Sequence, residues 1–103
     1  MNATITTPDN GTLIYQLQCD VVAATLPELR SELRRLVDEG ARDFVIDMAN
    51  TRMVDSSGLG LLIALHNSLK KHNGRLSLTH VSKDLMKLFE SMRIHQFLTV
   101  SPA

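Results

Sequence analysis

Residues 43–65 constrain the fold of this chain more than any other segment. An apolar run at Phe44, Val45 and Ile46 has the length and β-branched character of a strand. A short polar loop follows, and residues 59–65 then supply the apolar density of a helix. Because a strand that feeds a helix through a short loop is the repeating unit of parallel sheets, we expect an α/β fold. Three consecutive apolar positions further predict a central strand that is covered on both faces.

The other segments extend this alternation of strands and helices in both directions. A Pro-Asp-Asn-Gly turn at residues 8–11 separates two alternating runs, which predicts an antiparallel hairpin over residues 3–18. The remaining predicted elements are helices at 25–40, 57–72 and 83–93, and strands at 43–48, 76–81 and 97–100. At 103 residues the chain is expected to form one domain, spanning residues 1–103.

Two of the predicted helices have recognisable start signals. Thr25 and Glu28 have capping-box spacing, and Ser82 stands where an N-cap would precede the third helix. The apolar residues expected to face inward are Leu26, Leu29, Leu33, Leu36 and Val37 in the first helix, and Leu85, Met86, Leu88, Phe89 and Met92 in the third.

Composition argues against several partners. Because 11 basic residues balance 11 acidic ones, no broad field attracts nucleic acid or anionic lipid. The single cysteine, Cys19, excludes an internal disulfide and suits a reducing compartment. The N-terminus lacks signal-peptide features, and the apolar run at 61–65 is far shorter than the ~20 residues that cross a bilayer. We therefore expect a cytoplasmic protein with no membrane segment.

The loop sequence Asp-Ser-Ser-Gly-Leu-Gly at residues 55–60 allows two interpretations. Ser57 as N-cap would stabilise the following helix by roughly 1 kcal/mol over alanine. Capping needs a single hydroxyl, however, and leaves Asp55, Ser56 and Gly60 unexplained. Hydroxyls beside unpaired backbone N–H groups also suit a phosphate, so the loop is alternatively a modification or ligand site.

Enzyme and metal motifs do not account for this loop. A nucleophile elbow at Ser57 would need glycine where Asp55 stands, and a dinucleotide fingerprint would need a third glycine where Ile63 stands. Asp47 and Asp55 offer two carboxylates for a cation, but no His or Cys cluster supports them. We predict no catalytic residue, no metal site and no cofactor.

The leucine-rich run after the loop is more apolar than a one-sided helix requires. Residues 59 and 61–65 cover more than the ~100° stripe that packing on one face demands. Either neighbouring elements bury the additional side, or an apolar patch remains open beside the loop for a partner.

Residues 44–48, followed by residues 53–60, resemble the anti-sigma factor antagonists, which are single STAS domains. The resemblance covers nearly the whole chain, including the hairpin, the leucine-rich first helix, residues 74–78 and residues 81–83. It implies a mixed, mostly parallel sheet with an N-terminal antiparallel hairpin and three or four helices packed mainly on one face.

The resemblance also implies a function, which is partner switching without catalysis. The unphosphorylated protein would bind a serine-kinase anti-sigma factor and release its sigma factor. The kinase would phosphorylate Ser56, the first hydroxyl residue after the loop aspartate, and a PP2C-type phosphatase would reset it. The protein would act as a monomer or weak dimer. The alternative is a non-switching STAS subunit of a stressosome-like or transport-accessory complex.

The site residues implied by the resemblance surround Ser56. They are Asp20, Asp47 and Asp55 as acidic positions, Ser57 and Gly58 at the helix start, and Leu59, Leu61 and Leu62 on the partner-binding helix. Cys19 precedes Asp20 where the family often has glycine. Because Asp47 and Asp55 would oppose a phosphate on Ser56, we expect modification to act at the interface and leave the fold intact.

Overall fold

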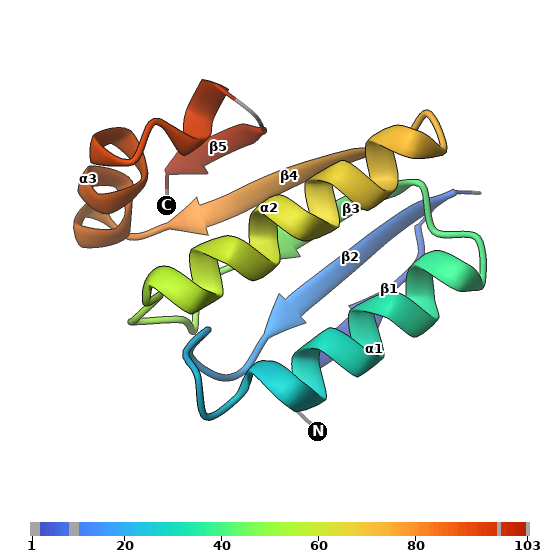
Figure 1. The fold of residues 1–103 in the computed structure, drawn as a ribbon, viewed down its shortest axis with the longest axis horizontal. Helices are drawn as coiled ribbons and strands as arrows, with labels where there is room; N and C mark the ends of the chain where they lie inside the picture. Colours follow the sequence, from blue (N-terminus) through green and yellow to red (C-terminus); the bar gives the residue numbers. More distant parts are fainter. Residues whose placement is uncertain (1–2, 9–10, 97, 103) are drawn as a thin grey trace.

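The computed structural model describes residues 3–8, 11–96 and 98–102 (Figure 1). Its elements, in chain order, are β1 (Ala3–Thr6), β2 (Thr12–Leu17), α1 (Leu26–Asp38), β3 (Asp43–Asp47), α2 (Ser56–Lys71), β4 (Arg75–Val81), α3 (Lys83–Ser91), the short 3₁₀ helix η1 (Ile94–Gln96) and β5 (Thr99–Pro102). This order confirms the predicted alternation of strands and helices.

The five strands form one mixed sheet in the order β1-β2-β3-β4-β5. β1 pairs antiparallel with β2, with Ala3 opposite Leu17, whereas the other three pairings are parallel. The N-terminal hairpin and the mostly parallel sheet are therefore confirmed. Two residues of the predicted turn, 9 and 10, lie outside the described residues.

Helices α1 and α2 lie side by side over one face of the sheet (Figure 1). In β3, Phe44 and Ile46 point beneath them and are 0% and 1% exposed, whereas Val45 is only half-buried. The expectation that this strand is covered on both faces is therefore wrong. Val45 lies on the open face between Ile14 of β2 and Ser77 of β4, and these neighbours shield it in part. The helices pack mainly on one face, as the resemblance implies.

Helix α1 buries the predicted apolar stripe, which consists of Leu26, Leu29, Leu33, Leu36 and Val37. Tyr15 of β2 lies fully buried beneath this helix, and its hydroxyl donates to the Glu32 carboxylate. Burial is the main cause that raises the pKa of the Tyr15 hydroxyl, and the hydrogen bond to Glu32 is the next largest. Glu32 of α1 thus supplies a hydrogen-bond acceptor for the buried Tyr15 hydroxyl, which offsets the cost of burying this polar group.

The helix starts follow the sequence signals only in part. Ser82 caps α3 as predicted, because its Oγ accepts from the Leu85 N–H at 3.2 Å. The capping box predicted at Thr25 is wrong: its hydroxyl donates to the Asp20 carbonyl at 2.6 Å and tightens the preceding loop instead. α3 ends at Ser91, so Met92 lies beyond the helix and is 56% exposed, contrary to its predicted inward position.

The predicted last strand is β5, which begins at Thr99. Leu98 is buried just before it, and Phe97 lies outside the described residues. α3 packs against η1 and β5, at the β5 edge of the sheet (Figure 1). In the described part of the chain, no helix combines the length and the hydropathy that crossing a bilayer requires.

Neighbouring substitutions in β3 test whether one face of the sheet is open. Ile46→Ala should lower the free energy of unfolding by about 2–5 kcal/mol, because it leaves a cavity beneath the helices. Val45→Ala should cost less than about 1 kcal/mol, because its side chain faces the open side of the sheet. Urea denaturation measures both, and equal losses would contradict the proposed one-sided cover.

Candidate functional site

The loops after β2 and β3 are joined at the carboxyl edge of the sheet. Val21 and Val54 form an isolated parallel bridge. The Val21 N–H donates to the Met53 carbonyl at 3.0 Å, and the Asp55 N–H donates to the Val21 carbonyl at 3.2 Å. These bonds extend the pairing of β2 with β3 past the strand ends and thereby determine where α2 begins.

Side chains reinforce this joint between the two loops. Oδ1 of Asp20 accepts from the backbone N–H groups of Arg52 at 2.9 Å and Met53 at 3.2 Å. Thr51 is 3% exposed, and its hydroxyl donates to the Cys19 carbonyl at 3.0 Å. The structure thus engages Asp20 in holding the loops together.

Asp55 is the N-cap of α2. Its Oδ1 accepts from the Gly58 N–H at 2.8 Å and from the Ser57 hydroxyl at 2.7 Å, and its Oδ2 accepts from the Ala23 N–H at 3.0 Å. The Ser57 hydroxyl and then the Gly58 N–H lower the pKa of Asp55. The prediction that Ser57 caps the helix is wrong. Helix α2 begins at Ser56, and the Asp55 carboxylate accepts from the Gly58 N–H as the N-cap.

The two glycines of the loop have different environments. A Cβ atom on Gly58 would lie 2.1 Å from the Val21 carbonyl oxygen, so only glycine lets α2 approach the β2 loop this closely. A Cβ on Gly60 would meet no atom within 4 Å. Packing therefore requires glycine at position 58 and not at position 60.

Ser56 is exposed and is the first residue of α2. Among residues 3–8, 11–96 and 98–102, its hydroxyl makes no hydrogen bond, whereas the Ser57 hydroxyl is bound to Asp55. The two adjacent serines therefore differ: Ser57 completes the cap, and Ser56 presents a free hydroxyl at the positive end of the helix dipole.

The leucines after the loop belong to the core. Leu59, Leu61 and Leu62 are 5%, 7% and 1% exposed, and Gly58 is also buried. The alternative of an open leucine patch is therefore wrong, because α2 packs on both α1 and the sheet. Any contribution of these residues to partner binding would act through the position of α2, and that role stays a prediction.

The exposed residues around Ser56 are mostly small side chains and one methionine, with Arg52 exposed next to that methionine. Met53 is 58% exposed, which is unusual for a large apolar residue. We call this region the serine surface; its exposed residues are Ala23, Ala24, Met53, Ser56, Ser57 and Gly60. Sequence reasoning missed Met53 because a single methionine in a loop has no periodicity that would reveal its exposure.

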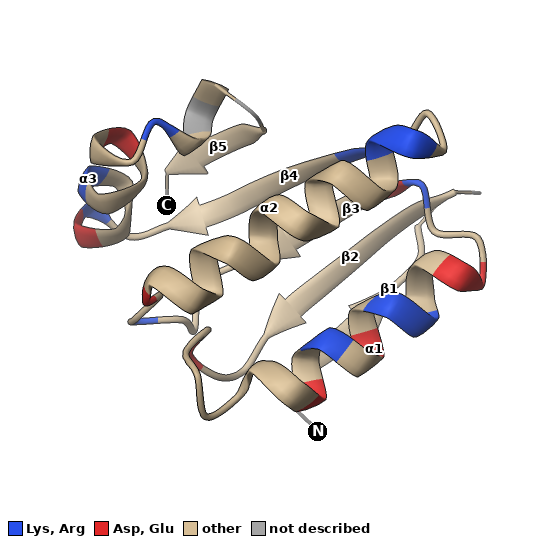
Figure 2. Ribbon diagram, viewed as in Figure 1, with Lys and Arg blue, Asp and Glu red and all other residues tan. Residues whose placement is uncertain are grey.

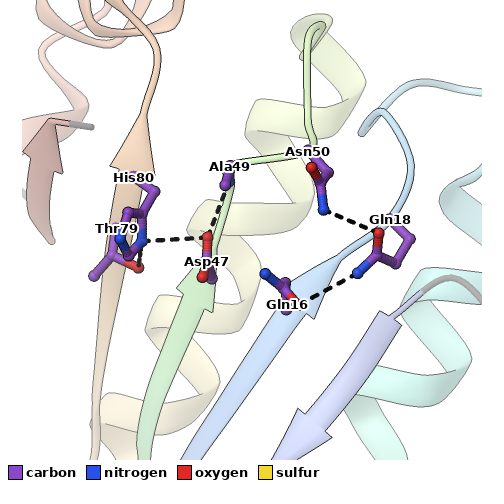
Figure 3. Close-up of polar contacts among 7 residues, drawn as sticks. All are labelled: Gln16, Gln18, Asp47, Ala49, Asn50, Thr79 and His80. Carbon is purple, nitrogen blue, oxygen red and sulfur yellow. Dashed lines mark hydrogen bonds and ion pairs between the residues drawn. The ribbon is translucent and has the colours of Figure 1, made fainter.

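Asp47 lies on the open face of the sheet, away from α2. Its Oδ1 accepts from the Ala49 N–H at 3.0 Å and lies 3.3 Å from Nδ1 of His80 in β4 (Figure 3). Alternation along β3 points Phe44 and Ile46 toward the helices and Asp47 away from them. That Asp47 opposes a phosphate on Ser56 stays a prediction.

Asp47 and His80 are accompanied by a short chain of amides on neighbouring loops and strands. Gln18 donates to Gln16 at 3.4 Å and accepts from Asn50 at 3.0 Å (Figure 3). Within the described residues, no three His, Cys, Asp or Glu side chains gather closely enough to hold a metal ion.

Comparison with known proteins agrees with the fold. The family model for the STAS domain matches residues 3–103. The anti-sigma-B factor antagonist of Bacillus subtilis is 32% identical over 84 residues, which cover 82% of this chain and 74% of that protein. The anti-sigma-B factor antagonist of Staphylococcus aureus is 30% identical over 77 residues, covering 75% of this chain and 71% of that protein.

Solved structures of the Bacillus protein SpoIIAA have the same fold. Its unphosphorylated form aligns with a TM-score of 0.74 at 20% identity, over 98% of this chain and 87% of that one. The phosphorylated form aligns with a TM-score of 0.73 at 18% identity, over 95% of this chain and 89% of that one. The chain belongs to the STAS domain family of anti-sigma factor antagonists.

The two loop glycines allow a matched test of how α2 docks. Gly58→Ala should destabilise the protein by about 2 kcal/mol or more, since the added methyl meets backbone that resists displacement. Gly60→Ala should instead stabilise it by about 0.5–1 kcal/mol through helix propensity. Chemical denaturation of both variants measures the difference, and a tolerated Gly58→Ala would contradict the close approach to Val21.

The lowered pKa of Asp55 makes the contribution of its charge depend on pH. The ionised carboxylate stabilises the fold above its ordinary pKa of 3.8, and this contribution is lost as the pH falls through the lower folded-state value. Asp55→Asn keeps an acceptor oxygen but has no charge. It should therefore have a lower melting temperature than the wild type near neutral pH, and this difference should shrink as the pH falls below 3.8. A difference that is independent of pH would contradict this role of the carboxylate.

Proposed function

We propose that this protein is an anti-sigma factor antagonist that acts by partner switching. Its unphosphorylated form binds a serine-kinase anti-sigma factor through the serine surface, and the anti-sigma factor then releases its sigma factor. Phosphorylation of Ser56 ends that binding, and a PP2C-type phosphatase restores it. The protein serves as a binding module with no chemistry of its own.

One observation carries the assignment of Ser56. The Asp55 carboxylate already occupies the Gly58 N–H and the Ser57 hydroxyl, which leaves Ser56 as the unengaged hydroxyl of the pair. Ser56 is exposed and lies next to the exposed Met53 loop, so a kinase can reach it without unfolding the helix. Esterification at this position breaks no hydrogen bond that the structure describes.

The charge of the phosphate supplies the switch. A phosphoserine adds about −1.5 to −2 charges near pH 7. Asp55 contributes a fixed negative charge next to it, and the residues that define the serine surface are uncharged, with the exposed Arg52 in the same loop as Met53. A partner face fitted to this neutral surface would have to desolvate the new charge, and a loss of 2–3 kcal/mol weakens binding about 30- to 150-fold.

The fold tolerates such a charge in a related protein. SpoIIAA is described in an unphosphorylated and a phosphorylated form, and both align with this chain at similar TM-scores of 0.74 and 0.73. This similarity supports a switch at the interface in which the domain stays folded. A helix N-terminus also favours a nearby negative charge, which offsets part of the repulsion from Asp55.

Serine variants test the proposal with a serine-kinase anti-sigma factor from the same genome. Ser56→Ala should bind the kinase as the wild type does and accept no phosphate. Ser56→Asp should keep the circular dichroism and melting temperature of the wild type and lose at least about 30-fold in affinity, because it places a charge at the contact. Binding is measured by calorimetry, and phosphate is located by mass spectrometry.

Ser57→Ala is the matched control, since it removes the neighbouring hydroxyl and leaves Ser56 in place. This variant should still be phosphorylated once, at Ser56. Phosphate found on Ser57 alone would contradict the site assignment. Tight binding to an assembly partner without any phosphorylation would instead favour a non-switching STAS subunit.

A further inference from the structure

A groove of about 370 Å³ runs between α1 and α2, behind the serine surface. Its α1 wall is formed by residues at helical spacing between Arg30 and Asp38, and its α2 wall by residues between Leu61 and His72. At a rise of about 1.5 Å per residue, these walls are roughly 12 and 16 Å long, which matches two to three turns of a helix.

The floor of the groove is apolar, and small α2 side chains are exposed along its edge. Leu33 and Val37 of α1 meet Leu61 and Leu65 of α2 at the bottom. Ala64 and Ser68 are exposed on the α2 side, and these small side chains keep the groove open along that helix. The same exposed side of α2 leads back through Gly60 to Ser56, so the groove is continuous with the serine surface.

The rim of the groove carries an excess of positive charge. Arg30, Arg34 and Lys71 line it against a single carboxylate, Asp38. Figure 2 shows blue and red residues interspersed along α1, blue residues at the end of α2 and an uncharged body of α2, so the excess of positive charge is confined to the residues that line the groove. Positions 30 and 34 are one helical turn apart, so their like charges repel each other in the free protein.

In the part of the chain that is described, none of these cations forms an ion pair, although Asp38 lies one helical turn from Arg34. The ion pairs there join Arg35 to Glu39, Arg75 to Asp43 and His80 to Asp47. Arg35, the neighbour of Arg34, thus has its partner on α1 itself, whereas the rim cations lie open to solvent. An external acidic group would reduce the repulsion between Arg30 and Arg34 along α1.

We propose that the α1–α2 groove binds an acidic amphipathic helix of the partner protein, while the serine surface contacts a second part of that protein. Apolar side chains of the helix pack against the exposed Ala64 and over the floor at Leu61 and Leu65, and its carboxylates reach Arg30, Arg34 and Lys71. This inference rests on the proposed function for the identity of the partner. The groove supplies charge-dependent recognition, and Ser56 supplies the switch.

A designed peptide tests the groove independently of any kinase. The probe is a capped 12-residue helical peptide with leucine at spacings of three and four and glutamate on both flanks; its counterpart carries lysine for glutamate. Nuclear magnetic resonance of the ¹⁵N-labelled protein should show saturable shifts at Leu33, Ala64 and Ser68 with the glutamate peptide only. Arg34→Ala should weaken this binding about three- to tenfold, and Arg35→Ala should change it less than about twofold.

The inference is overturned if the glutamate peptide produces no saturable shifts in the groove, if the lysine peptide binds equally well, or if both arginine variants weaken binding alike. A kinase that binds the wild type provides the second measurement. Arg34→Ala should weaken that complex and reduce its dependence on salt, while Ser56 phosphorylation still dissociates it. Failure of every kinase to bind would count against the proposed function, whereas the peptide result would still decide the role of the groove.

Discussion

The hydrogen bonds of the Asp55 carboxylate are the interaction on which the arrangement of the site depends. The carboxylate accepts from Gly58 and Ser57 at the start of α2 and from Ala23 in the loop after β2. It therefore caps the helix and joins it to the neighbouring loop at once. The contact of Gly58 with the Val21 carbonyl completes this joint, because only a residue without Cβ lets the helix reach the loop.

This joint explains why two adjacent serines have different roles. The Ser57 hydroxyl donates to the capping carboxylate, whereas the Ser56 hydroxyl lies exposed and takes no part in the cap. A modification at Ser56 therefore adds charge to the surface and leaves the supporting bonds in place. In the proposed switch, the residue that supports the fold and the residue that is modified are separated by a single position in the chain, so the domain would stay folded during regulation.

The sequence predicted the architecture well because its elements depend on local patterns. The hairpin turn, the leucine stripe of α1 and the Ser82 cap were sufficient to place β1, β2, α1 and α3. The cover of β3 was predicted wrongly, because three consecutive apolar residues do not reveal that Val45 faces an open side. Likewise, an apolar run did not distinguish a core helix from an exposed patch until the packing of α2 on α1 was known.

The details of the site depended on contacts between distant segments. Val21 and Ala23 lie more than thirty residues from Asp55, so no local spacing indicated that they bind the cap. The orientation of Asp47 required the register of the sheet, which places it opposite Thr79 and beside His80. The resemblance to the family identified the loop, and the structure distinguished the residues that support it from the hydroxyl it exposes.

The most direct test of this account compares the same protein before and after phosphorylation. The purified chain would be phosphorylated by its kinase, and the affinity of that kinase would be measured for both forms by calorimetry, with amide spectra recorded alongside. We predict that the phosphorylated form binds at least about 30-fold more weakly while its spectrum changes only around residue 56. Equal affinity of the two forms, or spectral changes throughout the core, would contradict a switch that acts at the surface of a folded domain.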